Sequence, residues 1–339
     1  MNVAINGFGR IGRLFFRQAF QKSDMTIVAI NDLGDLENLA YLLQHDSVYH
    51  AYEKRVSVDM QNHALVVDGV SVQVLQEKDP TKLPWKNLNI DVVVECTGAF
   101  DSYEKSSAHI TAGAKRVVIS APAKDDDGAI GKTVLMGINE VDAKDIKITS
   151  NGSCTTNACS PVMQVLHETI GIEKAILDTV HAYTATQSIV DSPVKGSDFR
   201  RGRAGAFNIS PSSTGAALTV TKIIKDLAGK FDGVAVRVPV IAGSLADITF
   251  IAKRDTTKEE VNEMLKKASE DPRWKGILKV TEEQLASSDI IGEPCGAFVD
   301  LQFTKVVGGN LVKVFSWYDN EYGYTSLLVR HVLMLQKFL

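Results

Sequence analysis

Residues 2–12 read NVAINGFGRIG, and this stretch decides the fold of the first half of the chain. A short apolar strand runs directly into three spaced glycines, and a helical pattern follows over residues 13–21. In such an arrangement Gly7 permits the tight turn, Gly9 lets the backbone approach a pyrophosphate, and Gly12 lets the helix pack closely on its strand. The stretch therefore predicts a dinucleotide site on a Rossmann-type parallel sheet; the alternative is a set of glycine turns that only shape the fold.

The acidic residue that a dinucleotide site needs also stands in the expected place. The next apolar strand covers residues 26–30, and Asp32 follows it, 20 positions after Gly12. A carboxylate accepts hydrogen bonds from a ribose 2′-hydroxyl and repels a 2′-phosphate. Asp32 therefore indicates NAD rather than NADP, unless it is only a cap or turn residue.

Two further stretches in the first half read as strands of the same sheet. Residues 91–96 and 115–122 are nearly continuous apolar runs, as expected for parallel strands buried on both faces. Thr97 and Ser120 stand at or near the carboxyl ends of these runs, where ligands of such sheets bind. Cys96 is interpreted as a core residue.

The second half of the chain has a different pattern of apolar and polar residues. Residues 234–239, 247–254 and 311–318 alternate between apolar and polar side chains, and the charged residues 258–270 read as a helix with a solvated face. We therefore predict an α/β Rossmann-type NAD-binding domain with a parallel sheet, followed by an α+β catalytic domain with a mainly antiparallel sheet covered by helices on one side. The predicted boundaries are 1–153 for the first domain, completed by a C-terminal helix at about 320–339, and 154–319 for the second.

Composition narrows the class of protein. At 339 residues the chain is long enough for two domains, and its net charge of -4 argues against a nucleic-acid binder without excluding small phosphorylated substrates. No apolar run approaches the roughly 20 residues that cross a bilayer, and the N-terminus opens into a strand pattern, so we expect a cytoplasmic protein. The four cysteines form neither a disulfide framework nor a Cys-x-x-Cys pair, and no metal site is expected.

One cysteine stands in a stretch suited to chemistry. Residues 150–157 read SNGSCTTN, immediately before a plausible helix over residues 158–170. A helix start favours negative charge and lowers a thiol pKa, so Cys154 is a candidate nucleophile, although a half-buried structural cysteine would fit the same pattern. His181, at the end of the strand-like residues 175–180, is either its base or a structural histidine, and spacing alone leaves both open.

Three segments together carry a family resemblance. NGFGRIGR at residues 6–13, SNGSCTTN at 150–157 and WYDNEYGY at 317–324 occur in the order in which phosphorylating glyceraldehyde-3-phosphate dehydrogenases carry them. The resemblance spans essentially the whole chain. It implies a homotetramer of glycolysis or gluconeogenesis that uses NAD, glyceraldehyde 3-phosphate and inorganic phosphate, and that forms 1,3-bisphosphoglycerate through a hemithioacetal and a thioester.

The resemblance also implies roles for individual residues. Cys154 would be the nucleophile and His181 its base, while Thr184 and Arg237 would hold the substrate phosphate. The residues that match the site of the attacking phosphate are Ser153, Thr155, Arg201, Thr214 and Gly215. The residues that match the NAD site, besides the glycines and Thr97, are Arg10, Ile11, Asp32, Lys78, Ser120 and Asn320. Without the resemblance, Arg200, Arg201 and Arg203 would fit a subunit contact equally well, and Asn320 would read as a turn residue.

The sequence departs from the family at two positions. Ala158 stands where a second cysteine is common, and Cys159 is rotated from Cys154 by roughly 140° on a helix. We therefore expect oxidised Cys154 to form a sulfenic acid or a mixed disulfide rather than an internal bond to Cys159. Lys78 replaces an adenine-side arginine, which puts that contact in doubt.

Two other functions remain open at this point. An erythrose-4-phosphate dehydrogenase shares the cysteine, histidine and glycine motifs, although Thr184 and residues 213–215 favour the glyceraldehyde 3-phosphate enzyme. A non-catalytic nucleotide- or RNA-binding protein belongs to a different class, and the acidic balance disfavours it.

Overall fold

The computed structural model describes residues 1–22 and 24–339, which divide into two compact units. The first unit contains residues 1–152 and 328–339, and the second contains residues 153–327. The division falls inside the last long helix, so this helix contributes residues to both units. No helix among the described residues is long and apolar enough to cross a membrane.

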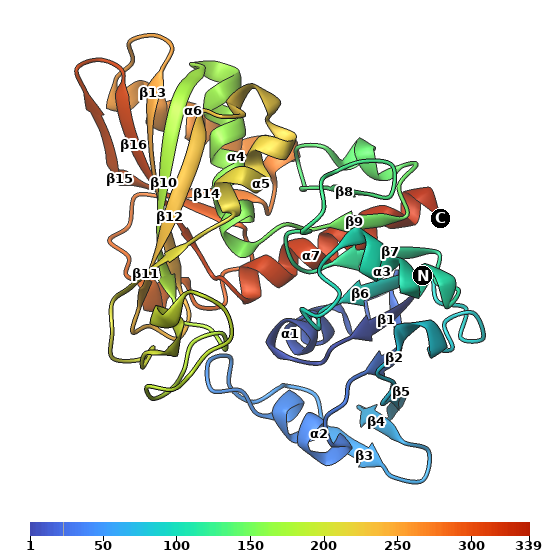
Figure 1. Ribbon diagram of the computed structural model, residues 1–339. Helices are drawn as coiled ribbons and strands as arrows, with labels where there is room; N and C mark the ends of the chain where they lie inside the picture. The colour runs from blue at the N-terminus through green and yellow to red at the C-terminus, as the bar shows by residue number, and fades with distance from the viewer. Residues whose placement is uncertain (23) are drawn as a thin grey trace. The chain divides into compact units, whose positions relative to one another are not determined.

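The described residues of the first unit form a nine-stranded sheet in the order β3-β4-β5-β2-β1-β6-β7-β9-β8 (Figure 1). The strands are β1 (Asn2–Asn6), β2 (Thr26–Asn31), β3 (Val56–Asp59), β4 (Ala64–Val67), β5 (Val70–Leu75), β6 (Val92–Glu95), β7 (Arg116–Ile119), β8 (Gly131–Thr133) and β9 (Ile148–Ser150). The helices are α1 (Arg10–Ala19), α2 (Leu36–Gln44) and α3 (Tyr103–Thr111). All pairs from β5 through β2, β1, β6, β7 and β9 to β8 are parallel, whereas β3–β4 and β4–β5 are antiparallel.

The order of these strands explains where a ligand can bind. The chain leaves β1 toward β2 on one side, and β6 pairs with β1 on the other side. Connections that diverge from neighbouring strands leave a crevice at the carboxyl edge of the sheet. The sheet is held from within by apolar side chains that are almost completely buried, among them Ala4, Ala29, Val93 and Val117. The predicted Rossmann-type sheet is confirmed.

The described residues of the second unit form a seven-stranded sheet in the order β11-β12-β10-β13-β16-β15-β14. Its strands are β10 (Ile172–Ala182), β11 (Ser210–Ser213), β12 (Phe231–Val238), β13 (Ser244–Ala252), β14 (Leu278–Thr281), β15 (Ala297–Val307) and β16 (Leu311–Tyr318). Its helices are α4 (Cys154–Thr169), α5 (Ala216–Ile223) and α6 (Lys258–Glu270), followed by α7 (Tyr322–Met334), which ends in the first unit. Four pairs are antiparallel, and β10–β12 and β14–β15 are parallel, so the mainly antiparallel sheet is also confirmed.

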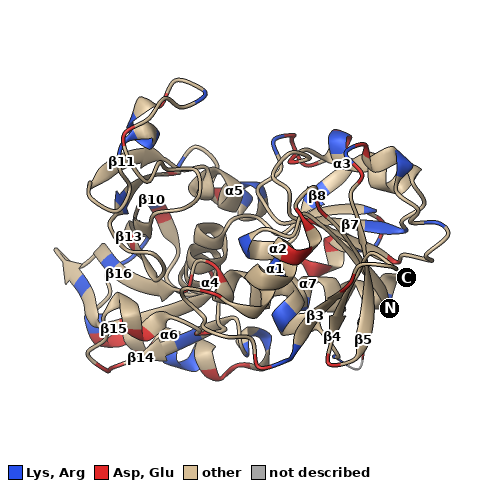
Figure 2. Cartoon of the chain, turned by 90° about the horizontal axis from the view of Figure 1, so that it is seen from below, with Lys and Arg blue, Asp and Glu red and all other residues tan. Residues whose placement is uncertain are grey.

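The helices α4, α5 and α6 lie on one face of this second sheet (Figure 1). Helix α6 buries Val261 and Leu265, and both charge signs lie along it in Figure 2, as predicted for a solvated face. The predicted starts of two other helices were wrong. Helix α1 begins at Arg10 and not at residue 13, and α4 begins at Cys154 and not at residue 158, because Gly9 and Ser153 supply the N-caps.

A buried arginine ties the end of the chain into the first unit. The Arg116 guanidinium donates to the carbonyls of Ala143 and Ile146 at 2.7 Å each, of Lys144 at 2.9 Å and of Phe338 at 2.8 Å. Its planar array of N–H groups suits several acceptors at once. Arg116 also lies over the Phe338 ring, with 5.7 Å between the guanidinium carbon and the ring centroid.

A buried histidine of α7 makes the stability of this unit depend on pH. His331 contacts Asn151 Oδ1 through Nδ1 at 3.0 Å and Thr149 Oγ1 through Nε2 at 2.9 Å. Burial lowers the pKa of His331 to about 3 from an ordinary value of 6.5. Between these values the unfolded chain binds a proton that the folded chain does not, so stability rises with pH across this window and is lost as pH falls below about 6.5.

We expect His331→Gln to reduce this pH dependence. A single group contributes a slope of at most about 1.4 kcal/mol per pH unit, and the glutamine amide does not titrate. The measurement is the free energy of unfolding in urea at several pH values below neutrality. His45→Gln, at an exposed position, is the matched control and should keep the wild-type slope. Equal slopes in the wild type and in His331→Gln would contradict the assignment.

Candidate active site

A pocket of about 450 Å³ lies in the first unit and is lined by residues that follow β1, β2 and β6. Of the predicted NAD residues, the pocket wall contains Gly7, Gly9, Asp32, Lys78 and Thr97. Gly7 has a φ of +94°, and a Cβ atom on it would lie 2.6 Å from the Thr97 nitrogen, so a larger residue does not fit. The predicted tight turn is therefore present.

The same turn leaves room for a phosphate group. A Cβ atom on Gly9 would meet nothing within 4 Å, whereas one on Gly12 would lie 2.1 Å from the Gly7 carbonyl oxygen. Gly9 is the N-cap of α1 and has no side chain with which to cap the helix, and the N–H groups at a helix start favour an anion. The Arg10 guanidinium itself pairs with Asp46.

Asp32 is held in place by backbone groups on two sides. Its Oδ2 accepts from Phe8 N at 2.6 Å and its Oδ1 accepts from Gly34 N at 2.8 Å. The carboxylate thus belongs to the pocket wall directly after β2, where a ribose hydroxyl needs an acceptor. Together with the open position at Gly9, this arrangement fits NAD.

Several pocket residues were not predicted from the sequence. They are Asn6, Asn31, Leu33, Glu77, Pro80, Ala99 and Phe100. Asn6 and Asn31 are the last residues of β1 and β2, so the rule that ligands bind at the carboxyl ends of strands could have found them. Cys96 is a correction: β6 ends at Glu95, and Cys96 is half-buried in the pocket wall rather than a core residue. Ser120 follows β7 directly, and its N–H donates to the Glu95 carbonyl at 2.9 Å.

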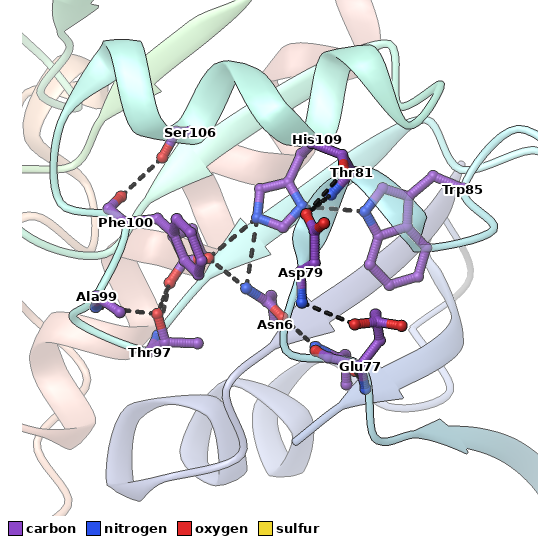
Figure 3. Close-up of polar contacts among 12 residues, drawn as sticks. Asn6, Glu77, Asp79, Thr81, Trp85, Thr97, Ala99, Phe100, Ser106 and His109 are labelled. Carbon is purple, nitrogen blue, oxygen red and sulfur yellow. Dashed lines mark hydrogen bonds and ion pairs between the residues drawn. The ribbon is translucent and has the colours of Figure 1, made fainter. Parts of the chain in front are cut away.

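Asn6, Thr97 and His109, which Figure 3 labels, all contact one buried carboxylate, that of Glu95. Glu95 is 2% exposed, and its Oε2 accepts from Asn6 Nδ2 at 2.5 Å and lies 3.1 Å from His109 Nε2. Its Oε1 accepts from the Thr97 N–H at 2.7 Å and from the Thr97 hydroxyl. Trp85 Nε1 donates to His109 Nδ1 at 3.0 Å, so the histidine carries its proton on Nε2 and donates to Glu95. Four donors therefore converge on one carboxylate.

We expect Glu95→Gln to destabilise the protein by about 3 kcal/mol and to weaken NAD binding. The NH₂ group of the glutamine can only donate, and it would face side chains that themselves donate to Glu95. Asn6 and Thr97, which line the pocket, lose their orientation at the same time. Urea unfolding and titration with NAD measure the two effects. Glu77→Gln is the matched control, since Glu77 Oε1 accepts from the Asp79 backbone at 2.8 Å in the same pocket. Indistinguishable results for the two variants would contradict the role of the network.

The second unit contains the predicted cysteine and histidine. Cys154 is the first residue of α4, and the Ser153 side chain caps the helix by accepting from Thr156 N at 3.0 Å. The Cys154 Sγ atom lies 3.4 Å from His181 Nε2, although 27 residues separate them. The structure therefore brings together the pair whose proximity the sequence left open.

The sheet explains how an arginine reaches the same histidine. In the parallel register of β10 and β12, His181 stands opposite Arg237. Arg237 Nη1 lies 2.8 Å from His181 Nδ1 and donates to the Ala182 carbonyl at 2.9 Å. His181 Nδ1 is 2.7 Å from that carbonyl, and in the tautomer that donates to it the Nε2 lone pair faces Cys154. The imidazole is thereby oriented as a base for the thiol.

Burial keeps both members of the pair uncharged. Burial raises the pKa of the Cys154 thiol, although Arg237, the Thr155 hydroxyl and backbone N–H groups act in the opposite direction. Burial and then the charge of Arg237 lower the pKa of His181 to about 3. The predicted lowering of the thiol pKa by the helix start was therefore wrong, because desolvation outweighs it. The thiol can instead pass its proton to His181 as it attacks.

Of the predicted phosphate residues, the arginines lie together. Arg201 and Arg237 line a small pocket of about 10 Å³ with Ser212. Arg201 donates to Ser212 Oγ at 3.0 Å and to Thr186 Oγ1 at 3.0 Å, and Thr186 in turn contacts the Thr184 hydroxyl at 2.9 Å. Thr184 is thus linked to this cluster through one hydroxyl.

The remaining predicted phosphate residues stand at two helix starts. Ser153 is the N-cap of α4 and Thr155 is its second residue, and the Ser153 hydroxyl contacts Thr156 Oγ1 at 2.8 Å. Gly215 is the N-cap of α5, and Thr214 Oγ1 accepts from the Ala216 N–H at 3.2 Å. Both positions present N–H groups that favour an anion.

Asn320, the predicted nicotinamide contact, belongs to the second unit. Its Oδ1 accepts from Ser244 Oγ at 2.9 Å and from Gly243 N at 3.2 Å. Ser244 Oγ also accepts from the Ala182 N–H at 3.1 Å, so Asn320 is connected to the strand end that carries His181. Ser244 was not predicted, and its place in an alternating strand gave no signal.

Cys159 lies one turn into α4 and is completely buried. Its thiol donates to the Thr156 carbonyl at 3.7 Å, and burial raises its pKa to about 12. A buried thiol of this kind is a poor attacking group. The expectation that oxidised Cys154 forms no internal bond to Cys159 stays a prediction.

Comparison with known proteins identifies the family. Residues 1–103 match the family model described as glyceraldehyde 3-phosphate dehydrogenase, NAD binding domain, and residues 153–320 match that of the C-terminal domain. A glyceraldehyde-3-phosphate dehydrogenase of Borreliella burgdorferi is 47% identical over 97% of this chain and 98% of its own length. That of Thermotoga maritima is 47% identical over 99% of both chains, and that of Zymomonas mobilis is 44% identical over 100% of this chain and 99% of its own. The chain belongs to the glyceraldehyde-3-phosphate dehydrogenase family.

Proposed function

We propose that the protein catalyses the NAD-dependent oxidative phosphorylation of D-glyceraldehyde 3-phosphate to 1,3-bisphosphoglycerate. The observation that carries the proposal is the 3.4 Å contact between Cys154 Sγ and His181 Nε2, beside the guanidinium of Arg237. A nucleophile, its base and an anion-binding group thus stand together. Membership of the family supports the same activity, with NAD as the cofactor.

In the first step Cys154 attacks the aldehyde carbon. Its proton moves to His181 Nε2, whose lone pair faces the sulfur because Nδ1–H donates to Ala182. The product is a hemithioacetal on Cys154. The developing oxyanion is stabilised by the Cys154 backbone N–H and by the protonated ring of His181, which then gives its proton to the oxygen, so that the hemithioacetal carries a hydroxyl and His181 is neutral again.

In the second step the hemithioacetal is oxidised to a thioester. His181 accepts the hydroxyl proton, and NAD, when bound, supplies the hydride acceptor. The thioester keeps the energy of the oxidation in a reactive acyl group. Inorganic phosphate then attacks the acyl carbon, the Cys154 sulfur leaves, and the acyl phosphate is released.

We propose that two groups of residues hold the two anions. Thr184 and Arg237 hold the phosphate of the substrate, and Arg237 contacts the base directly, so this phosphate sits close to the reacting carbon. The residues proposed for the attacking phosphate are Ser153, Thr155, Arg201, Thr214 and Gly215.

We propose that the first unit binds NAD through Gly7, Gly9, Gly12, Arg10, Ile11, Asp32, Lys78, Thr97 and Ser120. We propose that Asn320 holds the nicotinamide carboxamide. The functional boundaries proposed are residues 1–153 with about 320–339 for the NAD-binding domain and 154–319 for the catalytic domain.

We also propose a homotetramer in the cytoplasm, acting in glycolysis or gluconeogenesis, with neither a membrane nor a nucleic acid as its main partner. Apolar side chains exposed on strands of the second sheet, among them Ile176, Val234 and Leu311, support an interface between copies. Exposed Ile189 and Phe199, which precede Arg200, support a second contact.

NADH formation from glyceraldehyde 3-phosphate and from erythrose 4-phosphate, each with and without inorganic phosphate, tests the function. We expect rapid NADH formation from glyceraldehyde 3-phosphate that depends on phosphate, because the thioester needs it to turn over. Phosphate-independent turnover that favours erythrose 4-phosphate would contradict the proposal that glyceraldehyde 3-phosphate is the substrate. Absence of NADH formation from both sugar phosphates would favour a non-catalytic protein.

A further inference from the structure

A row of buried hydroxyl groups connects Cys154 to a backbone carbonyl of the second unit. Thr155 Oγ1 lies 4.0 Å from the Cys154 sulfur and 2.8 Å from Tyr318 Oη. Tyr318 Oη lies 2.7 Å from Thr179 Oγ1, which donates to the Leu245 carbonyl at 3.2 Å. Thr155, Thr179 and Tyr318 are all less than 5% exposed. Four different elements, α4, β16, β10 and β13, supply this row.

The carbonyl at its end determines the direction of every hydrogen bond. A carbonyl oxygen can only accept, so the Thr179 hydroxyl donates to Leu245 and its oxygen accepts from Tyr318. Tyr318 has a single hydroxyl proton, so its oxygen accepts from Thr155. Thr155 therefore donates its only hydroxyl proton to Tyr318, and the lone pairs of its oxygen face the Cys154 sulfur. This polarity suits an uncharged sulfur and opposes a thiolate.

We propose that Thr179, Tyr318 and Thr155 form a reversible hydroxyl relay that decides whether Thr155 offers lone pairs or a proton to the Cys154 sulfur. While the sulfur is a thiol or a thioester, the relay points toward Leu245. When the sulfur becomes a thiolate, the three hydroxyls rotate, and each donates in the opposite direction, ending with Thr155 on the sulfur. No proton changes its oxygen, and the only bond given up is the one from Thr179 to Leu245.

The Tyr318 ring also packs against His181, so one residue of the relay contacts the base that accepts the thiol proton. The ring centroids of Tyr318 and His181 are 5.9 Å apart, and the rings meet edge to face at 76°. A tyrosine at this position therefore positions both the hydroxyl next to the nucleophile and the imidazole. Thr179 and Tyr318 are positioning residues, because neither contacts the Cys154 sulfur directly.

This inference rests on the proposed role of Cys154 as the nucleophile, but its test requires no substrate. The measurement is the rate at which iodoacetamide alkylates Cys154 as a function of pH, followed on the Cys154 peptide by mass spectrometry. The midpoint of this profile reports how readily the sulfur becomes a thiolate. Failure to form NADH with the expected alkylation shifts intact would reject the proposed function and leave the relay standing.

Thr179→Val removes the hydroxyl that links Tyr318 to the Leu245 carbonyl and keeps the branched shape of the side chain. Tyr318 then has only Thr155 to donate to, and Thr155 donates to the sulfur. We expect the alkylation midpoint to move to lower pH by about half a unit or more. Thr155→Val removes the donor itself and should move the midpoint to higher pH by a similar amount.

Thr179→Ser keeps the hydroxyl and is the matched control, with a midpoint close to that of the wild type. Tyr318→Phe leaves Thr155 without its acceptor and should also move the midpoint to lower pH, which keeps the test available if Thr179→Val does not fold. Loss of packing alone would move the Val variants in one common direction. Shifts of the same sign in Thr179→Val and Thr155→Val, or equal midpoints in Thr179→Val and Thr179→Ser, would overturn the proposal.

Discussion

Replacing Cys154 with serine is expected to lower kcat/KM for NADH formation by about 10³-fold or more. The serine hydroxyl is far less acidic than a thiol, and His181, whose pKa is lowered to about 3, is too weak a base to make up the difference. The variant also loses the good leaving group on which the release of the acyl group to phosphate depends. The steady-state rate of NADH formation measures the effect.

Cys159→Ser provides the matched control for this prediction. Cys159 lies on the same helix, is completely buried, and uses its thiol only to donate to the Thr156 carbonyl. A serine can make the same bond, as the neighbouring Ser160 already does at 2.6 Å. We expect activity close to that of the wild type. Undiminished NADH formation by the Cys154→Ser variant would contradict the proposed covalent mechanism.

His181→Gln is expected to lower kcat by about 10² to 10⁴-fold, the usual contribution of a general base. A glutamine can contact the sulfur but cannot take up its proton or that of the hemithioacetal. The KM for glyceraldehyde 3-phosphate should change much less than kcat, because Thr184 and Arg237 remain in place. Initial rates over a range of substrate concentrations separate the two constants.

The pH profile gives a second check on His181. Burial keeps the pKa of His181 near 3 and raises the pKa of the Cys154 thiol, so the neutral thiol and the unprotonated base that react in the first step are both present across the neutral range. We therefore expect the wild-type kcat/KM to change little with pH across the neutral range. His167→Gln, on the same unit, should keep both the profile and the rate. A His181→Gln variant within tenfold of the wild-type kcat would contradict the assignment.

The parts of the fold that could be predicted are those that local sequence determines. The glycine turn at residues 7–12 and the acidic residue after β2 occupy adjacent stretches, and the structure places Gly7 and Asp32 in one pocket wall. The same holds for α6, whose predicted ends, 258 and 270, are those of the structure. Each of these features depends on turn chemistry or periodicity over a few residues.

The contact between Cys154 and His181 could not be predicted in this way. It depends on where α4 packs and on the register of β10 with its neighbours, and the sequence between the two residues does not determine either. The direction of the thiol pKa was missed for the same reason. A helix start is visible in the sequence, whereas the depth of burial that outweighs it is a property of the folded unit.

The hydrogen-bond network around Glu95, next to the cofactor pocket, could not be predicted from the sequence either. Its partners are Asn6, Thr97 and His109, and Trp85 fixes the proton of that histidine. In the sequence Glu95 is only a polar residue at the end of an apolar run. The network exists because three parts of the chain meet at one edge of the sheet.

The hydrogen bonds of Arg116 and His331 have a consequence for how the first unit folds while the chain is being synthesised. Arg116 binds the Phe338 carbonyl, and His331 contacts Thr149 and Asn151, so the first unit depends on the last residues to leave the ribosome. While the second unit is being translated, the nascent first unit lacks these partners and cannot complete its folding from the N-terminus onward. A premature stop anywhere before residue 331 therefore removes both contacts, even though it leaves residues 1–152 intact.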